Sequence, residues 1–134
     1  MRLKRAVTVK VIVTEEFKSN LSEELNKTLT RVEFASQQLD MQLRRYVPEV
    51  AKVDLEQAGR LRREIEGERQ RHENMRAEIK ERLDEVTGLE IGSEFEQGNV
   101  ESYVDVAVGD NLIEKLSGAE IVIKDGIIQE IRES

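Results

Sequence analysis

The chain has 134 residues, of which 37% are charged and only 4% aromatic, and its formal net charge is −7. This composition is typical of long helices with a large surface rather than of a compact enzyme. Cysteine is absent and histidine occurs once, which excludes disulfides and a cysteine nucleophile and disfavours any His-based metal site, so we expect no catalytic residue, cofactor or metal.

The first segment, residues 1–14, is predicted to form a half-buried β-strand. A valine occupies every second position from Val7 to Val13, and this period of two places the valines on one face. Thr14 then stands where a helix N-cap is expected, and the two glutamates after it suit the positive end of a helix dipole. The strand should therefore lead directly into a helix.

Two stretches of similar length, residues 15–46 and 55–86, have the apolar spacing of three and four residues that is typical of a left-handed coiled coil. The predicted seam positions are Leu21, Leu25, Thr28, Val32, Ala35, Leu39, Gln42 and Tyr46, then Ala58, Leu61, Ile65, Glu68, His72, Met75, Ile79, Arg82 and Val86. The only proline, Pro48, disfavours helical geometry before it, and Asp54 is suited to cap a second helix, so a turn is predicted over residues 47–53. Together these stretches predict a long antiparallel two-helix hairpin.

The middle of this hairpin is predicted to be weak. Folding back at about Val50 would place Val32 opposite Glu68 or Arg69, and Thr28 opposite His72. We interpret His72 as a polar seam residue that fixes the register or loosens the packing. Gly67 adds to the weakness, because glycine inside a helix costs about 1 kcal/mol relative to alanine.

The last segment, residues 88–134, is predicted to be mainly β-structure. Alternating valines indicate a strand over residues 100–108, and residues 112–116 suit a single helical turn. Asp125-Gly126 between two isoleucine-rich runs is typical of a type I′ hairpin.

The two β-segments are too short to be stable alone, so they should pair with each other. The predicted fold class is α+β: a small antiparallel β-domain of four to five strands, as a sheet or small barrel, made of residues 1–14 and 88–134. Residues 15–87 would form the coiled-coil hairpin inserted into this domain.

The second helical stretch carries candidate contact residues. Its arginines are candidates for contact with RNA phosphates or a protein partner: Arg60, Arg62, Arg63, Arg69, Arg71 and Arg76. Interleaved glutamates can neutralise many of them along the helix, which leaves an ordinary solvated face as the alternative. The section from Arg60 to Arg63 is the least neutralised. At the turn itself, Val50 and Val53 are candidate protein contacts.

Acidic residues accumulate towards the C-terminus, where they disfavour nonspecific nucleic-acid binding. Four of them alternate along the predicted strands and are interpreted as solvent-facing residues that protect a sheet edge: Glu94, Glu96, Glu101 and Asp105. A bound cation or a basic partner is the alternative, but the loop pattern of a calcium site is missing.

Four motifs resemble a known family. They are VTVKVIVTE from Val7, VGDNL from Val108, EKLSGAEI from Glu114 and KDGII from Lys124. These motifs are similar to those of the YlqD family of small bacterial proteins, in a cyanobacterial-type form, over almost the whole chain. The resemblance implies no established activity, ligand or catalytic residue. It also implies a link to the ribosome, because some relatives are encoded beside ribosomal-protein and rRNA-maturation genes.

We therefore expect a nonenzymatic interaction or scaffold module, which self-associates through a coiled-coil arm or presents that arm to a protein partner of unknown identity. The alternative is a ribosome- or RNA-associated factor that uses the basic face of the second helix. No stretch approaches the ~18 apolar residues of a membrane span, so we expect no membrane association and a cytoplasmic location.

Overall fold

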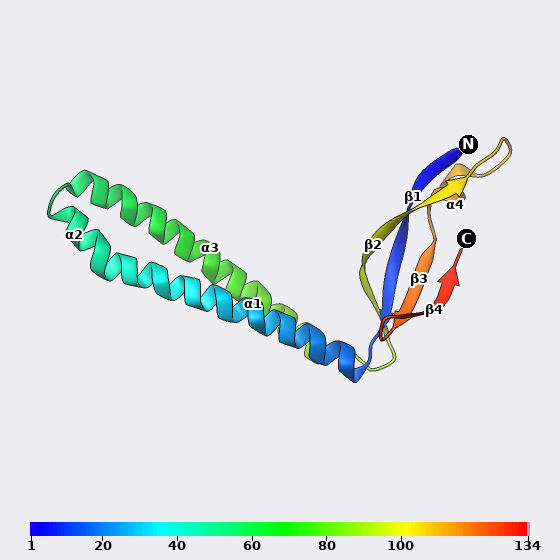
Figure 1. Cartoon of the computed structure of the whole chain (residues 1–134), viewed down its shortest axis with the longest axis horizontal. Helices are drawn as coiled ribbons and strands as arrows, with labels where there is room; N and C mark the ends of the chain where they lie inside the picture. Colours follow the sequence, from blue (N-terminus) through cyan, green and yellow to red (C-terminus); the bar gives the residue numbers. More distant parts are fainter. Residues whose placement is uncertain (134) are drawn as a thin grey trace. The chain divides into compact units, whose positions relative to one another are not determined.

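The computed structural model describes residues 1–133 of the chain (Figure 1). The elements follow in the order β1 (Arg2–Ile12), α1 (Glu15–Met41), a π-helical turn (Gln42–Tyr46), α2 (Val47–Ala51), α3 (Leu55–Thr87), β2 (Glu94–Asp105), α4 (Leu112–Leu116), β3 (Glu120–Lys124) and β4 (Ile127–Arg132). The chain divides into two compact units, the sheet unit, Met1–Ser19 with Leu89–Ser134, and the helical unit, Asn20–Gly88. The predicted α+β class is confirmed.

The sheet unit contains a four-stranded mixed sheet in the order β2-β1-β3-β4. β1 pairs antiparallel with β2 but parallel with β3, so the prediction of a wholly antiparallel sheet is wrong. The reason is topological. After β2 the chain reverses direction, but it returns on the far side of β1, so the strand that is antiparallel to β2 lies parallel to β1. The strands with only one neighbour are β2 and β4, which makes the sheet open rather than a barrel.

The two faces of the sheet differ in character. The predicted half-buried strand is confirmed, because Val7 and Val11 of β1 are buried on one face. Val11 lies level with Phe95 of β2, and the ring of Phe17, from the first turn of α1, packs on Phe95 with the centroids 5.6 Å apart. Lys10 projects from the opposite face, which carries charged residues from the neighbouring strands.

The local caps and turns of this unit are as predicted. The Phe17 N–H donates to Thr14 Oγ1 at 3.0 Å, so Thr14 caps α1. The single helical turn at residues 112–116 is present as α4. Asp125 and Gly126 connect β3 to β4 with φ values of 49° and 81°, which a type I′ turn requires of its two central residues.

In the helical unit, α1 continues through the π-helical turn into α2, and α3 returns beside them in the opposite direction (Figure 1). The prediction that the helix stops before Pro48 is therefore wrong, and the turn is confined to residues 52–54. Pro48 directly follows the π-helical turn, so the helix continues past a residue that has no backbone N–H to donate. In the wider turn before it, the Val47 N–H donates to the Gln42 carbonyl, five residues back.

The π-helical turn also shifts the buried stripe of the first helix by one residue. Tyr46, a predicted seam residue, is 58% exposed, whereas Val47 is 1% exposed. A π-turn holds more residues than an α-turn, so the positions after it are rotated and Val47 faces inward. Val47 packs with Ala58 and Ile65 in a small core, against which lie Leu39, Leu43, Val50, Ala51 and Leu61.

Two ion pairs join α1 to α3 nearer the middle of the unit. Arg69 Nε lies 2.9 Å from Asp40 Oδ1, and Arg76 Nε lies 3.3 Å from Glu33 Oε1. The predicted alignment of Arg69 with Val32 is wrong by about two helical turns, because the chain turns later than Val50. Coiled-coil packing of the two helices stays a prediction.

A polar groove of about 490 Å³ lies along these ion pairs, lined by Glu33, Ser36, Asp40, Glu66, Arg69, Gln70, Glu73 and Arg76. His72 is half-buried on α3, with Nε2 3.9 Å from Glu68 Oε2. Its Nδ1 is buried and has no hydrogen-bond partner within residues 1–133. Within the same residues, no helix is long and apolar enough to cross a membrane.

The substitution Val47→Ala should destabilise the helical unit by about 2 kcal/mol, because it removes two methyl groups from a closed core. The matched control is Val53→Ala. Val53 is 90% exposed, so its truncation should cost less than about 0.5 kcal/mol. Urea unfolding followed by helical circular dichroism measures both. Equal effects would show that the core at the π-turn is not as described.

Candidate functional site

The end of the helical unit around its turn carries five exposed arginines without an ion pair among the described residues. We call this group the basic end; its members are Arg44, Arg45, Arg60, Arg62 and Arg63. The last three are the section that the sequence identifies as least neutralised. Arg44 and Arg45 escaped the sequence prediction, which considered only the second helix. Their position next to the predicted turn could have identified them as candidate contact residues.

The other three predicted arginines are neutralised within the helical unit. Arg69 pairs with Asp40 of α1, and Arg71 pairs with Glu68 one turn before it. Arg76 pairs with Glu33, and its Nη1 lies 3.5 Å from Glu73 Oε1. The six predicted arginines are therefore two groups with different surroundings rather than one basic face.

The two predicted valines at the turn also differ from each other. Val50 is half-buried and packs against the core formed by Val47, Ala58 and Ile65. Val53 projects into solvent, followed by the exposed Leu55. Val53 is therefore free to contact a partner, whereas Val50 mainly supports the fold.

Beside the basic end lies a groove of about 460 Å³. Its lining residues are Gln38, Met41, Gln42, Arg45, Tyr46 and Leu61. The π-helical turn produces this arrangement, since it leaves Tyr46 exposed while the core takes Val47. The groove therefore has apolar and aromatic walls and one unpaired guanidinium.

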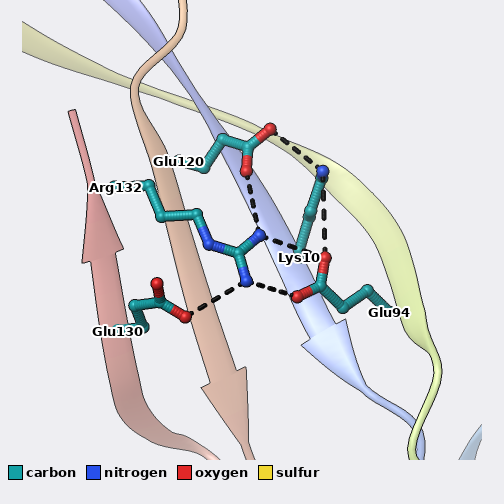
Figure 2. Close-up of polar contacts among 5 residues, drawn as sticks. All are labelled: Lys10, Glu94, Glu120, Glu130 and Arg132. Atoms are coloured by element: carbon teal, nitrogen blue, oxygen red, sulfur yellow. Dashed lines mark hydrogen bonds and ion pairs between the residues drawn. The ribbon is translucent and has the colours of Figure 1, made fainter. Parts of the chain in front are cut away.

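A second concentration of charge lies on the sheet (Figure 2). All four strands contribute to this ionic cluster, which consists of Lys10 of β1, Glu94 of β2, Glu120 of β3, and Glu130 and Arg132 of β4. Arg132 is its centre: Nη2 lies 2.6 Å from Glu94 Oε1 and 3.1 Å from Glu130 Oε2, and Nη1 lies 3.3 Å from Glu120 Oε2. Lys10 Nζ lies 2.9 Å from Glu120 Oε1.

These contacts shift pKa values in the cluster so that the charged form of each shifted group is favoured. The hydrogen bond from Arg132 holds the pKa of Glu94 below its ordinary value of 4.5. The hydrogen bond from Lys10 does the same to the pKa of Glu120, and in return the Glu120 carboxylate raises the pKa of Lys10. The Glu94 carboxylate raises the pKa of Arg132 further above neutrality.

The cluster stabilises the sheet rather than offering a binding site. Arg132 on one edge strand contacts Glu94 on the other, so its side chain spans the sheet, and every charge is already used by a neighbour. Glu94 lies exposed on the edge strand β2, as the sequence predicts, but its carboxylate is also paired with Arg132, which the sequence analysis did not predict. No group of three or more histidines or carboxylates arranged to hold a metal occurs in the described residues 1–133.

The fold and these surfaces define a class: a small α+β protein in which a mixed four-stranded sheet accompanies a pair of long helices with a basic end. The chain belongs to the YlqD family, as the four sequence motifs indicate: the model of this family, described as YlqD protein, matches residues 1–132. It is also similar to a crystal structure of a protein of unknown function from Synechococcus sp. WH 8102, with a TM-score of 0.84 and 28% identity over 99% of this chain and 95% of that chain. No curated protein matches the sequence significantly.

The ionic cluster predicts a specific acid sensitivity. Because the pKa values of Glu94 and Glu120 are lowered on folding, the stability that they contribute is complete above about pH 4.5 and is lost as the pH falls through the lowered values. Arg132→Gln should therefore destabilise the sheet at neutral pH and flatten the fall in melting temperature below pH 4.5. Thermal unfolding from pH 7 to pH 3 measures this.

Arg2→Gln is the matched control, since Arg2 is an exposed arginine on β1 that lies 3.7 Å from Asp105. Its pH profile should follow that of the unmodified chain. Parallel profiles for Arg132→Gln and the unmodified chain would contradict a stabilising role for the cluster.

Proposed function

We propose that this protein is a nonenzymatic interaction module in which a coiled-coil arm, residues 15–87, is inserted into a β-domain of residues 1–14 and 88–134. The arm presents its turn to a protein partner or associates with another copy. The observation that carries this proposal is the exposed end of the helical unit, which carries both the unpaired arginines of the basic end and the exposed Val53 and Leu55. Such a mixture of apolar and arginine side chains is typical of protein interfaces.

The coiled-coil part of the proposal rests on the heptad spacing and on the ion pairs between the helices. Arg69 with Asp40, and Arg76 with Glu33, hold α1 and α3 in one alignment. Self-association is supported by apolar side chains that the two helices leave exposed. Phe34 is 61% exposed on α1 and Met75 is exposed on α3, so the helices of a second copy would bury surface that the monomer cannot.

A role without catalysis is supported by the state of the charged groups. The residues with shifted pKa values, Lys10, Glu94, Glu120 and Arg132, already bind one another. This leaves no poised acid or base among them for a substrate. We also propose a cytoplasmic location. The chain has no cysteine, so it forms no disulfides and its folding does not depend on an oxidising compartment.

The second candidate function is that of a ribosome- or RNA-associated factor. It is favoured by the five unpaired arginines of the basic end, since guanidinium groups bind phosphates well and each contact releases counterions from RNA. On this hypothesis Arg60, Arg62 and Arg63 contact phosphates, together with Arg44 and Arg45.

Self-association should appear in light scattering after size-exclusion chromatography. We expect a mass above the 15.4 kDa of one chain that rises with concentration. Phe34→Ser should lower it towards one chain, whereas Tyr103→Ser, at an exposed aromatic residue of β2, should not. A strict monomer at concentrations on the order of tens of micromolar would contradict self-association.

RNA binding would have a different signature. Affinity for a structured rRNA fragment should fall steeply with salt, with a log–log slope of roughly −0.7 to −0.9 per phosphate contact. Changing Arg60, Arg62 and Arg63 to glutamate should abolish binding and reduce that slope. Changing Arg31 and Arg82, which are exposed and unpaired elsewhere on the helices, should have little effect. Equal loss in both variants would indicate nonspecific attraction.

A further inference from the structure

The groove beside the π-helical turn has the features of a docking site for a peptide segment. Its volume of about 460 Å³ is large enough for one or two side chains and lies in the range of ordinary binding pockets. Its walls combine Met41 and Tyr46 of the first helix with Leu61 of α3. Methionine adapts its shape to an apolar partner, and tyrosine and arginine are enriched among the residues that dominate binding energy.

The charge around the groove determines the sign of its partner. Arg45 lines the groove and has no ion pair among the described residues. The carboxylate of Asp40, which lies nearby on α1, is already taken by Arg69. Arg44 and Arg60, on the same end of the helical unit, are likewise unpaired. The groove therefore carries one cation, Arg45, that forms no ion pair with a carboxylate of the described residues.

The lining favours a peptide over a nucleic acid. Nucleic acids that enter such sites stack their bases on aromatic rings, but Tyr46 is the single ring of this groove. Apart from Arg45, the remaining wall consists of leucine, methionine and glutamine side chains, which suit an aliphatic side chain of a bound peptide. Carboxylates that flank this anchor would complete charge-assisted hydrogen bonds with Arg45.

From this geometry we infer that the groove lined by Met41, Tyr46 and Leu61 binds an acidic, amphipathic segment of a protein partner. An apolar side chain of the segment enters the groove, and a neighbouring carboxylate pairs with Arg45. This inference rests on the proposed function, because it names the chemistry of the partner that the helical unit would bind.

The test uses the full chain and two synthetic helical peptides with the same leucine pattern. One peptide has glutamate at every polar position and the other has lysine, and binding is followed by fluorescence anisotropy. The glutamate peptide should bind and the lysine peptide should not. Arg45→Glu and Tyr46→Ala should each weaken binding at least about tenfold. Neither side chain belongs to the buried core, so both variants should keep the circular dichroism spectrum of the unmodified chain.

Arg31→Glu is the matched control, because Arg31 is an exposed, unpaired arginine of α1 outside the groove. It should bind the glutamate peptide as well as the unmodified chain does. Equal binding of both peptides would overturn the inference, as would an equal loss of binding in the Arg31 and Arg45 variants. It would also be overturned if single-stranded RNA displaced the peptide from the unmodified chain and the Tyr46→Ala variant no longer bound that RNA. If the peptide fails while Phe34→Ser still lowers the mass in light scattering, only this inference fails; failure of both measurements removes the proposed function as well.

Discussion

The position of β1 in the middle of the sheet constrains the rest of the molecule. Its first residue pairs with the end of β2, as Arg2 with Asp105, and its later part pairs with β3, as Thr8 with Glu120. Every partner of the strand therefore comes from beyond the helical unit. The chain must return to the end of β1, and backbone hydrogen bonds between Val13 and residues 92–93 hold it there. Such distant pairings make the sheet the part of the fold that depends most on the whole chain.

The sheet unit contains four strands, the short helix α4 and the first turn of α1, so its apolar core is limited, and the two faces of the sheet stabilise it in different ways. One face buries the valines of β1 with Phe17 and Phe95. The other face holds the ionic cluster, in which the fork of Arg132 reaches carboxylates on three strands. Partly exposed ion pairs contribute little when isolated, but several that share one guanidinium limit the ways in which the strands can shift.

Features that depend on a few adjacent residues could be predicted from the sequence. The alternation of Val7 to Val13, the cap at Thr14 and the turn at Asp125-Gly126 are of this kind, because propensity and hydrogen bonding act locally there. The parallel pairing of β1 with β3 and the cluster around Arg132 were not predictable, since they depend on which strand the returning chain meets.

Pro48 was misleading for a related reason. Its local preference for ending a helix was overridden by the burial of Val47, and the helix absorbed the proline through a wider turn. The same change of phase moved Tyr46 to the surface and created a groove that the heptad pattern does not contain.

The π-helical turn has a consequence for how sequences of this kind should be aligned. It acts as the equivalent of one inserted residue, so the heptad phase before Gln42 and the phase after Tyr46 belong to different frames. A relative that lacks one residue between these positions would have an uninterrupted α-helix, and its equivalent of Val47 would still face the core, because removal of the extra residue restores a single heptad frame. An alignment with such a relative therefore needs its one-residue gap inside the interval from Gln42 to Tyr46, since only there do the buried positions on both sides stay matched.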